Sequence, residues 1–212
     1  MKHLLIIGAR GFGREVYNLF VACKQAGLEM DCKGFLDDKE DALDGYCNYP
    51  PIISSVEDYY IEDGDVFICA LGDVNYKRKY TEYLMKKGAE FISLIHPSAQ
   101  IGLNTTIGKG CIIRSNASIS CDIQIGDFVT IMGFCVLGHD AKIGDYCHIG
   151  AHSFLGGYSV LEDQVTLNPN VKILPHKKVC QNSSVGIGSI VMTNIRPGIT
   201  VFGVPAKKLN IK

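Results

Sequence analysis

Histidine is the side chain best suited to take up a proton at neutral pH, and three of the six histidines in this sequence cluster at positions 139, 148 and 152. Asp140 follows His139, and a carboxylate can orient an imidazole and stabilise its charged form. Neighbouring residues on a straight strand point to opposite faces, so this pair needs a bend, which Gly138 permits. His139 is a candidate general base. A histidine that is only solvated is the commoner case, and residue type alone does not exclude it.

A glycine-rich stretch near the start of the chain could bind an anion. Gly8, Gly11 and Gly13 lie between a predicted strand, residues 2–8, and a predicted helix, residues 14–24. Backbone N–H groups at such a turn, together with a helix N-terminus, suit a phosphate. A tight turn that needs glycine explains the pattern equally well. The spacing is G-x-x-G-x-G rather than G-x-G-x-x-G, so a dinucleotide-dependent oxidoreductase is a weak alternative.

Two adjacent acids, Asp37 and Asp38, follow the predicted second strand, residues 32–36. In a doubly wound sheet, an acid at this position often contacts a ribose or a base. The alternative is a solvated acidic loop, because residues 39–41 are Lys-Glu-Asp.

The remaining pattern up to residue 95 predicts a small Rossmann-like β-α-β domain with a parallel sheet. Strands are expected at 65–71 and 90–95, and Pro50-Pro51 is expected to break the chain between elements. A helix is expected at 75–87. Its predicted inner face is formed by Tyr76, Tyr80, Tyr83 and Leu84.

From Ile101 to Val191 every sixth residue is Ile, Leu or Val, and no insertion breaks the register. This period predicts a solenoid of hexapeptide units over residues 96–196, with about 18 residues per coil if the cross-section is triangular. Glycine follows the aliphatic residue at 102, 108, 126, 138, 144, 150, 156 and 186, where corners are expected to need a permissive backbone. Residues 197–212 are expected to cap the last coil.

Composition excludes several classes of function. The formal net charge is −1 without a basic stripe, which gives no electrostatic case for nucleic acid or an anionic membrane. The apolar start is too short for a signal peptide or a membrane span. The nine cysteines include no CxxC pair, and Cys111, Cys135 and Cys147 share one phase of the hexad, as small core residues would. We therefore expect a reduced, cytoplasmic protein without a bound metal.

Several motifs resemble one branch of the hexapeptide acyltransferases, which contains nucleotide-sugar N-acetyltransferases of bacterial glycan synthesis and sialic acid O-acetyltransferase-like proteins. The motifs are Ile-Ile-Gly-Ala-Arg-Gly-Phe-Gly-Arg-Glu at 6–15, Leu-Gly-His-Asp at 137–140, His148-Ile-Gly, Leu155-Gly-Gly157 and Gly203-Val-Pro-Ala-Lys207. The resemblance covers nearly the whole chain. It implies a left-handed parallel β-helix, although the general rule for parallel crossovers favours the right hand.

The resemblance also implies a homotrimer with acetyl-CoA as co-substrate, active sites between neighbouring β-helices and the nucleotide of an activated sugar on the N-terminal domain. His139 aligns with the family's general base, Asp140 with its orienting acid and His148 with a histidine that contacts acetyl-CoA. The backbone N–H of Gly157 is the suggested oxyanion donor. Gly186 and Lys207 are weaker candidates for the CoA channel. On this interpretation, a UDP-4-amino-sugar type of acceptor attacks the thioester directly.

Two departures from the family pattern leave the acceptor open. Met132 stands where some N-acetyltransferases have Asn, and Phe12 stands where some have His. Acetylation of a sugar or sialic acid hydroxyl is therefore an alternative to acetylation of an amine. An alternative of another class is a non-catalytic trimeric scaffold with a nucleotide-binding domain. The resemblance assigns no role to His152.

Overall fold

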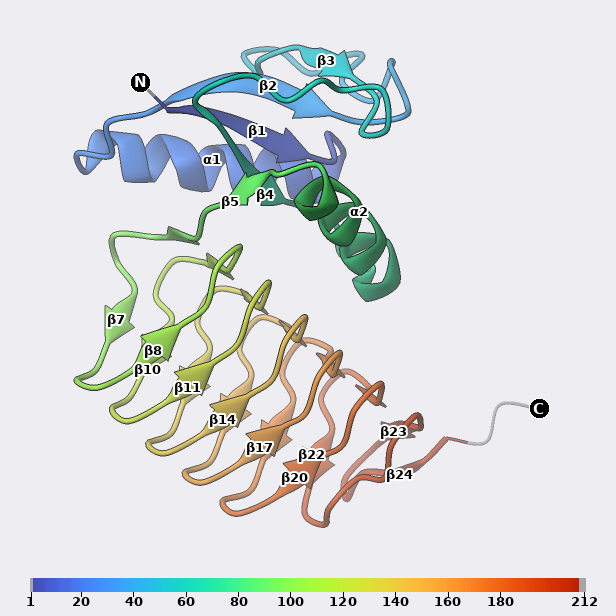
Figure 1. The fold of residues 1–212 in the computed structure, drawn as a ribbon. Coiled ribbons are helices and arrows are strands. Elements are labelled where there is room, and N and C mark those ends of the chain that lie inside the picture. The colour runs from blue at the N-terminus through green and yellow to red at the C-terminus, as the bar shows by residue number, and fades with distance from the viewer. Residues whose placement is uncertain (1, 210–212) are drawn as a thin grey trace. The chain divides into compact units, whose positions relative to one another are not determined.

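The computed structural model describes residues 2–209 and divides into two compact units, Met1–Pro97 and Ser98–Lys212. The first unit is an open α/β sheet and the second is a solenoid of short strands (Figure 1).

The first unit is built on a parallel sheet with strand order β3-β2-β1-β4-β5. Its strands are β1 His3–Ile7, β2 Asp31–Leu36, β3 Ile52–Ser54, β4 Asp65–Cys69 and β5 Glu90–Phe91. The central strands β1 and β4 are apolar and buried, as expected for strands covered on both faces. The predicted Rossmann-like topology is confirmed. The order of strands reverses beside β1, and ligands of such sheets bind at this kind of switch point.

The segment after Pro50-Pro51 is the edge strand β3, which the sequence did not predict as a strand. The carbonyl of Pro51 accepts a hydrogen bond from Phe35 N at 2.9 Å, so the proline pair leads into the edge instead of ending the ladder. The predicted strand 90–95 is interrupted. Two residues separate β5 from β6, Leu94–Ile95, and of these two strands β5 is the one that pairs with β4.

Helix α1 spans Gly11–Gln25 and therefore begins three residues before its predicted start. Gly11 and Gly13 lie in its first turn, so the prediction that they form the turn before the helix is wrong. Gly13 is needed because a Cβ there would lie 1.9 Å from the carbonyl oxygen of Gly8. The glycine permits close packing of helix on strand.

Helix α2 spans Val74–Lys86 and begins with Asp73 as its N-cap, whose carboxylate accepts hydrogen bonds from the N–H groups of Asn75 and Tyr76. Its buried residues are Lys77, Thr81 and Leu84. The predicted tyrosine face is wrong except for Leu84: Tyr76 is 59% exposed, and the hydroxyls of Tyr80 and Tyr83 donate hydrogen bonds to Asp38 and to the carbonyl of Glu57.

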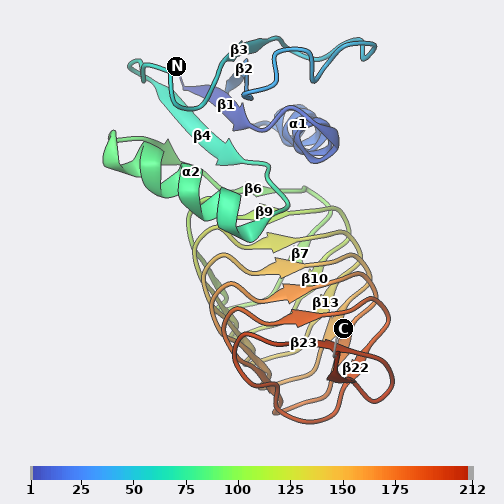
Figure 2. The same cartoon turned by 90° about the vertical axis from the view of Figure 1, so that its right-hand side faces the viewer.

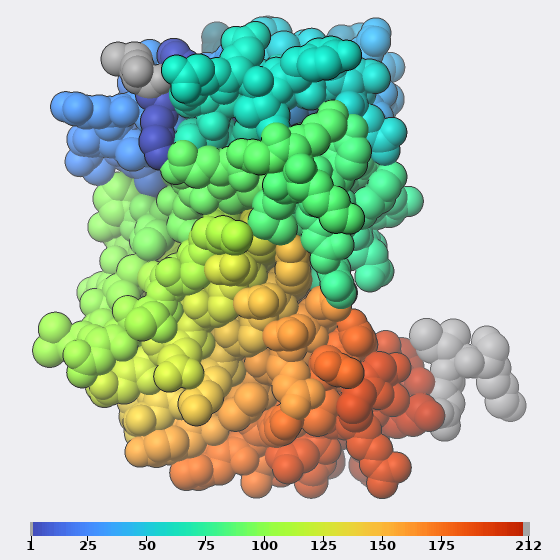
Figure 3. All heavy atoms as spheres, viewed as in Figure 1, coloured from blue at the N-terminus to red at the C-terminus, as the bar shows by residue number. Residues whose placement is uncertain are grey.

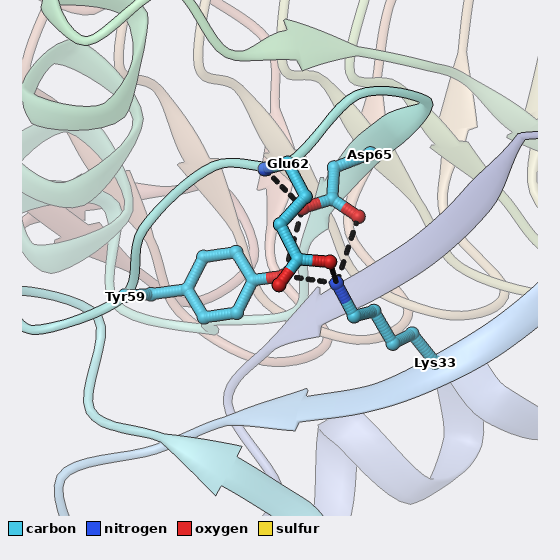
Figure 4. A network of polar contacts seen from close by, with 4 residues as sticks. All are labelled: Lys33, Tyr59, Glu62 and Asp65. Atoms are coloured by element: carbon cyan, nitrogen blue, oxygen red, sulfur yellow. Dashed lines mark hydrogen bonds and ion pairs between the residues drawn. The ribbon is translucent and has the colours of Figure 1, made fainter.

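A polar cluster fixes the loop before β4 to strand β2 (Figure 4). Asp65 is buried and accepts hydrogen bonds from the hydroxyl of Tyr59 at 2.7 Å and from Glu62 N at 2.8 Å. Lys33 Nζ lies 3.2 Å from Asp65 and 2.7 Å from Glu62. These contacts outweigh the effect of burial and raise the pKa of Lys33. The buried carboxylate is thus compensated, and it is a structural feature rather than a candidate site.

The second unit is a parallel β-solenoid with three short strands per coil (Figure 2). The first face contains β7 Gln100–Ile101, β10 Ser118–Ile119, β13 Val136–Leu137, β16 Phe154–Leu155, β19 Lys172–Ile173 and β22 Ile190–Val191. The second contains β8 Thr106–Ile107, β11 Gln124–Ile125, β14 Lys142–Ile143, β17 Val160–Leu161 and β20 Lys178–Val179. The third contains β9 Ile112–Ile113, β12 Thr130–Ile131, β15 His148–Ile149, β18 Thr166–Leu167, β21 Ser184–Val185 and β23 Thr200–Phe202, with β24 Lys207–Lys208 antiparallel to β23.

The hexad aliphatics stack in register between coils, for example Ile119 on Leu137 and Leu137 on Leu155. The predicted 18-residue coil is confirmed by this pairing. All sixteen side chains are buried except Ile101 and Ile107, the first two of the series. Successive coils pack directly on one another, and they follow the colour order in Figure 3.

The glycines after the aliphatic residues are not the left-handed corners that the sequence predicted. The left-handed residues lie two positions later and are mostly not glycine, as at Asp122, Asp140 and Tyr158, where φ is 58–60°. The glycine is needed for space instead: a Cβ at Gly138 would lie 2.6 Å from the backbone nitrogen of Gly157 in the next coil. At this position the backbone of one coil therefore lies directly against the backbone of the next coil.

After the last hexads, β23 pairs in parallel with β21 and folds back into β24, so the third face continues beyond the repeat. The predicted tail 197–212 extends past this hairpin, and residues 210–212 lie outside the described part of the chain. Among the helices of residues 2–209, none is long and apolar enough to cross a membrane.

Candidate active site

The side chains of His139 and Asp140 meet at the corner that follows β13. Asp140 has φ 59°, which an aspartate tolerates, and this turn directs its carboxylate back to the imidazole. Asp140 Oδ2 lies 2.8 Å from His139 Nδ1. An ionised carboxylate can only accept, so Nδ1 donates and Nε2 carries the free lone pair of the neutral ring. The imidazole is about half exposed and can reach a bound molecule.

Gly157, from the next coil, lies against the same imidazole. A Cβ on Gly157 would be 2.9 Å from both Cε1 and Nε2 of His139. Within residues 2–209, no atom accepts a hydrogen bond from the Gly157 amide. The corner thus combines a proton acceptor with a backbone donor that is available to a developing negative charge.

A second carboxylate, Asp122, occupies the equivalent corner of the preceding coil. Asn104 donates a hydrogen bond to Asp122 Oδ1 at 2.9 Å. This bond, a contact with Cys121 and the nearby charge of His139 lower the pKa of the Asp122 carboxyl. Asp122 therefore stays ionised and favours positive charge at this corner. Sequence reasoning missed it, although it lies one 18-residue coil before Asp140.

The first unit has a separate cavity of about 470 Å³ at the carboxyl ends of β1, β2 and β4. It is lined by Ile7, Gly8, Arg10, Phe12, Leu36, Asp37, Asp38, Val56, Ala70, Leu71, Gly72, Asp73, Tyr76 and Tyr80. The predicted residues Gly8, Asp37 and Asp38 thus come together, whereas Gly11 and Gly13 do not line the cavity. This volume is within the range of small-ligand sites.

The two predicted acids differ in their surroundings. Asp37 is 9% exposed, and its carboxylate accepts hydrogen bonds from Ala9 N at 2.8 Å and Lys39 N at 3.0 Å. It therefore holds the turn after β1 in place. Asp38 is exposed and accepts a hydrogen bond from the hydroxyl of Tyr80 at 2.7 Å. This hydrogen bond, more than burial, raises the pKa of Tyr80 to about 12.

Sequence reasoning missed the contribution of α2 to this cavity. Asp73, Tyr76 and Tyr80 belong to the N-cap and the first two turns of the helix. The signal that could have found them is Gly72-Asp73, which follows β4 as Asp37-Asp38 follows β2, because carboxyl ends of neighbouring parallel strands meet at one edge.

The three predicted CoA-contacting residues outside the His139 corner share the third face of the solenoid. His148 lies on β15, Gly186 directly follows β21 and Lys207 lies on β24. His139 and Gly157, in contrast, lie at the corner between the first and second faces. A corner between two faces of a three-sided coil lies across that coil from the third face. The structure of one chain therefore does not bring His139 and His148 together.

Other residues singled out by the sequence have simple surroundings. His152 is exposed and stacks on Phe134 with ring centroids 5.1 Å apart. Met132 is half-buried, and Phe12 lines the cavity of the first unit. The nine cysteines are thiols, and residues 2–209 contain no group of three or more His, Cys, Asp or Glu side chains that could hold a metal ion.

Comparisons with known proteins agree with this two-unit architecture. Residues 3–84 match the family profile of the PglD N-terminal domain, and residues 83–187 match that of the GMPPB C-terminal domain. The structure of PerB from Caulobacter crescentus in complex with CoA and GDP-perosamine superimposes with a TM-score of 0.88 over 99% of this chain and 98% of that chain, at 24% identity. Residues 3–84 are thus similar to a PglD-type N-terminal domain, and a solenoid of hexapeptide repeats follows them.

Two curated relatives of this hexapeptide-repeat protein carry names of N-acetyltransferases. GDP-perosamine N-acetyltransferase of Escherichia coli O157:H7 is 31% identical over 80 residues, which are 38% of this chain and 36% of that protein. UDP-N-acetylbacillosamine N-acetyltransferase of Bacillus subtilis is 29% identical over 119 residues, which are 54% of this chain and 52% of that protein. The matched segments thus span about a third to a half of these relatives.

Proposed function

We propose that this protein transfers the acetyl group of acetyl-CoA to the amino group of a nucleotide-linked sugar. The observation that carries the proposal is the corner at His139, where a carboxylate-oriented imidazole lies beside a backbone N–H that has no acceptor among the described residues. Acyl transfer from a thioester needs these two groups, a base and an oxyanion donor. The names of the two relatives, and the CoA in the PerB complex, support the same chemistry.

In the proposed mechanism the neutral amine attacks the thioester carbonyl directly. His139 Nε2 accepts the proton that the amine loses, and Asp140 stabilises the resulting imidazolium through Nδ1. The carbonyl oxygen becomes an oxyanion and accepts a hydrogen bond from Gly157 N–H, a contribution of about 3 kcal/mol in comparable sites. Collapse of the tetrahedral intermediate expels the CoA thiolate and leaves the acetamide. No acyl-enzyme forms.

The cavity of the first unit is the proposed site for the nucleotide. It lies at the carboxyl ends of parallel strands, and its size suits a nucleoside. Asp38 can accept hydrogen bonds from ribose hydroxyls or from base N–H groups, and Arg10 can pair with a phosphate. One relative is named for a GDP-linked sugar and the other for a UDP-linked sugar, so the UDP-4-amino-sugar type and its GDP counterpart are both acceptors to test.

A homotrimer is the proposed assembly. The proposed base and the proposed CoA contacts His148, Gly186 and Lys207 lie on different sides of one solenoid, so a site that uses both needs the third face of a second copy. The exposed side chains Val136 and Phe154 neighbour each other on the first face, beside the His139 corner, and support an interface there. The nine thiols fit the reducing cytoplasm, which we propose as the compartment.

The test is an assay of the purified protein with acetyl-CoA and panels of UDP- and GDP-linked amino sugars, with the matching hydroxyl sugars as a second panel. CoA release and the mass of the product distinguish N- from O-acetylation. We expect acetylation of an amine, and His139→Ala should lower kcat by about 10²–10⁴-fold while acetyl-CoA still binds.

His152→Ala is the matched control, because His152 is an exposed corner histidine without a carboxylate contact of the Asp140 kind. It should keep the wild-type kcat. Wild-type turnover in His139→Ala would contradict the proposed base, and transfer to a hydroxyl would contradict the proposed acceptor. Failure of acetyl-CoA to bind in calorimetry would contradict the proposal that the protein is an acetyltransferase.

A further inference from the structure

An aromatic ring packs against the proposed base from the next coil. The imidazole of His139 and the ring of Tyr158 meet edge to face, with centroids 5.2 Å apart and an interplanar angle of 88°. Tyr158 in turn lies parallel to His176 of the following coil, at 4.9 Å and 4°. The three rings therefore form one continuous column along the corner.

Stacked rings at the corners are a general feature of this solenoid. Phe128 stacks on Tyr146 at 5.0 Å, and Phe134 stacks on His152 at 5.1 Å. Such pairs offset part of the strain of bulky residues in the left-handed conformation. Stacking of Tyr158 on His176 would therefore, by itself, indicate only a contribution to the stability of the solenoid. Tyr158 differs from these rings because it also contacts His139.

We propose that Tyr158 is a positioning residue that fixes the orientation of the His139 imidazole for proton transfer. This inference rests on the proposed function of His139 as general base. Asp140 holds only one atom of the ring, Nδ1, and the imidazole could still pivot about that bond. Gly157 limits the ring near Cε1 and Nε2, and the Tyr158 ring limits it at its edge.

The backbone makes Tyr158 a firm support. Tyr158 N donates a hydrogen bond to the carbonyl of His139 at 3.0 Å, so the two residues are tied together directly. His176 N donates to the carbonyl of Gly157 at 3.0 Å, which ties the coil that carries His176 to the coil that carries Tyr158. The ring of Tyr158 is thus held between His139 and His176, and His176 acts one layer further from the base.

The expected consequence is a loss of turnover rather than of binding. A misplacement of about 1 Å at a reacting group can cost about 10²-fold. Tyr158→Ala should lower kcat by about 10- to 100-fold and change the KM for acetyl-CoA by less than about threefold. Tyr158→Phe keeps the ring and should restore most of kcat. His176→Ala should give a smaller loss than Tyr158→Ala.

Tyr146→Ala is the matched control, since Tyr146 has the same residue type, a φ of 57° and a parallel ring partner. It should lower thermal stability about as much as Tyr158→Ala and leave kcat unchanged. The double variant His139→Ala with Tyr158→Ala should be no slower than His139→Ala alone, because Tyr158 acts through His139.

The outcomes separate this inference from the proposed function. If His139→Ala is inactive and Tyr158→Ala turns over like the wild type, the positioning role is wrong and the proposed base stands. Equal losses in Tyr158→Phe and Tyr158→Ala also overturn it, because the hydroxyl and not the ring would then be needed. If His139→Ala is fully active, the proposed function itself has failed.

Discussion

At the scale of single residues, the candidate site depends on short-range geometry at one corner. His139 and Asp140 are neighbours in sequence, and only the left-handed conformation of Asp140 brings their side chains to 2.8 Å. Gly157 comes from the next coil and leaves room for the imidazole because it has no Cβ. The base, its carboxylate and the backbone donor therefore form a unit only when two coils stack.

Gly157→Ala tests how closely the imidazole must be placed. The new methyl carbon would lie 2.9 Å from Cε1 and Nε2 of His139, so the ring has to move. We expect the variant to fold, because the nearest atoms are those of an exposed side chain, and to lose about 10²-fold in kcat. Steady-state kinetics and a thermal melt check both points. A kcat close to that of the wild type would show that the imidazole tolerates displacement.

The hydrogen bond between Tyr80 and Asp38 predicts a pH dependence of stability. The bond, followed by burial, raises the pKa of Tyr80 from 10.0 to about 12. The folded state thus holds this proton more tightly than the unfolded state. Its contribution to stability is complete below pH 10 and is lost as the pH rises towards 12.

Tyr80→Phe should therefore lose less stability than the wild type between pH 10 and 12, as measured by urea denaturation at a series of pH values. Tyr60→Phe is the control, because Tyr60 is 88% exposed and should leave the pH profile unchanged. Parallel pH profiles for the wild type and Tyr80→Phe would rule out the hydrogen bond as a source of stability.

At the scale of elements, an acidic ladder ties the coils together at the corner after the second face. Asp127 Oδ1 accepts from Lys109 N at 2.9 Å, Asp145 Oδ1 from Asp127 N at 2.8 Å, and Asp163 Oδ1 from Asp145 N at 2.9 Å. The residue before each of the first two acids is glycine because a larger residue would overlap the next carboxylate. A Cβ at Gly126 would lie 2.2 Å from Asp145 Oδ1. The hexads that read Ile-Gly-Asp thus encode a contact between coils.

Gly126→Ala should lower the free energy of unfolding by about 1–3 kcal/mol, because the methyl group overlaps the Asp145 carboxylate. Asp145→Ala should cost about 0.5–1.5 kcal/mol through the lost hydrogen bond. The double variant should cost less than the sum, since removal of the carboxylate relieves the overlap. Chemical denaturation measures all three, and strictly additive losses would contradict the ladder contact.

At the scale of the whole molecule, the solenoid presents its candidate residues on separate surfaces. The proposed base lies at one corner, and the proposed CoA contacts lie on the third face. Val136 and Phe154 are 43% and 39% exposed, although they are large and apolar. Such neighbouring apolar side chains on a regular sheet favour contact with another copy.

Sedimentation should therefore give a trimer, of about 70 kDa from three chains of 23.2 kDa. Phe154→Glu should weaken the assembly and lower activity with it, because burial of one Phe contributes about 1.5–3 kcal/mol per copy. Tyr60→Glu, at an exposed position of the first unit, is the control and should stay trimeric. A monomeric wild-type protein with full activity would exclude the proposed shared site.

Much of the fold could be predicted because its signals are local and periodic. Stacked coils must place an aliphatic side chain inward once per face, so the sequence repeats every six residues and the coil length follows. The strands of the first unit appear as short apolar runs because their side chains are buried too. The tyrosine face of α2 could not be predicted, because Tyr80 and Tyr83 bond to Asp38 and Glu57, which are far away in sequence.

The sequence by itself determined the two-unit architecture, the 18-residue coil and the neighbouring pair His139 and Asp140, since each depends on residue type and spacing along the chain. Tertiary structure alone decided that the glycines make space between coils instead of forming the corners. It also decided that α2 helps to line the cavity, and that Gly157 and Tyr158 enclose the imidazole of His139. The physical reason is that these contacts join residues 18 or more positions apart, and their distances exist only after the coils and strands have packed.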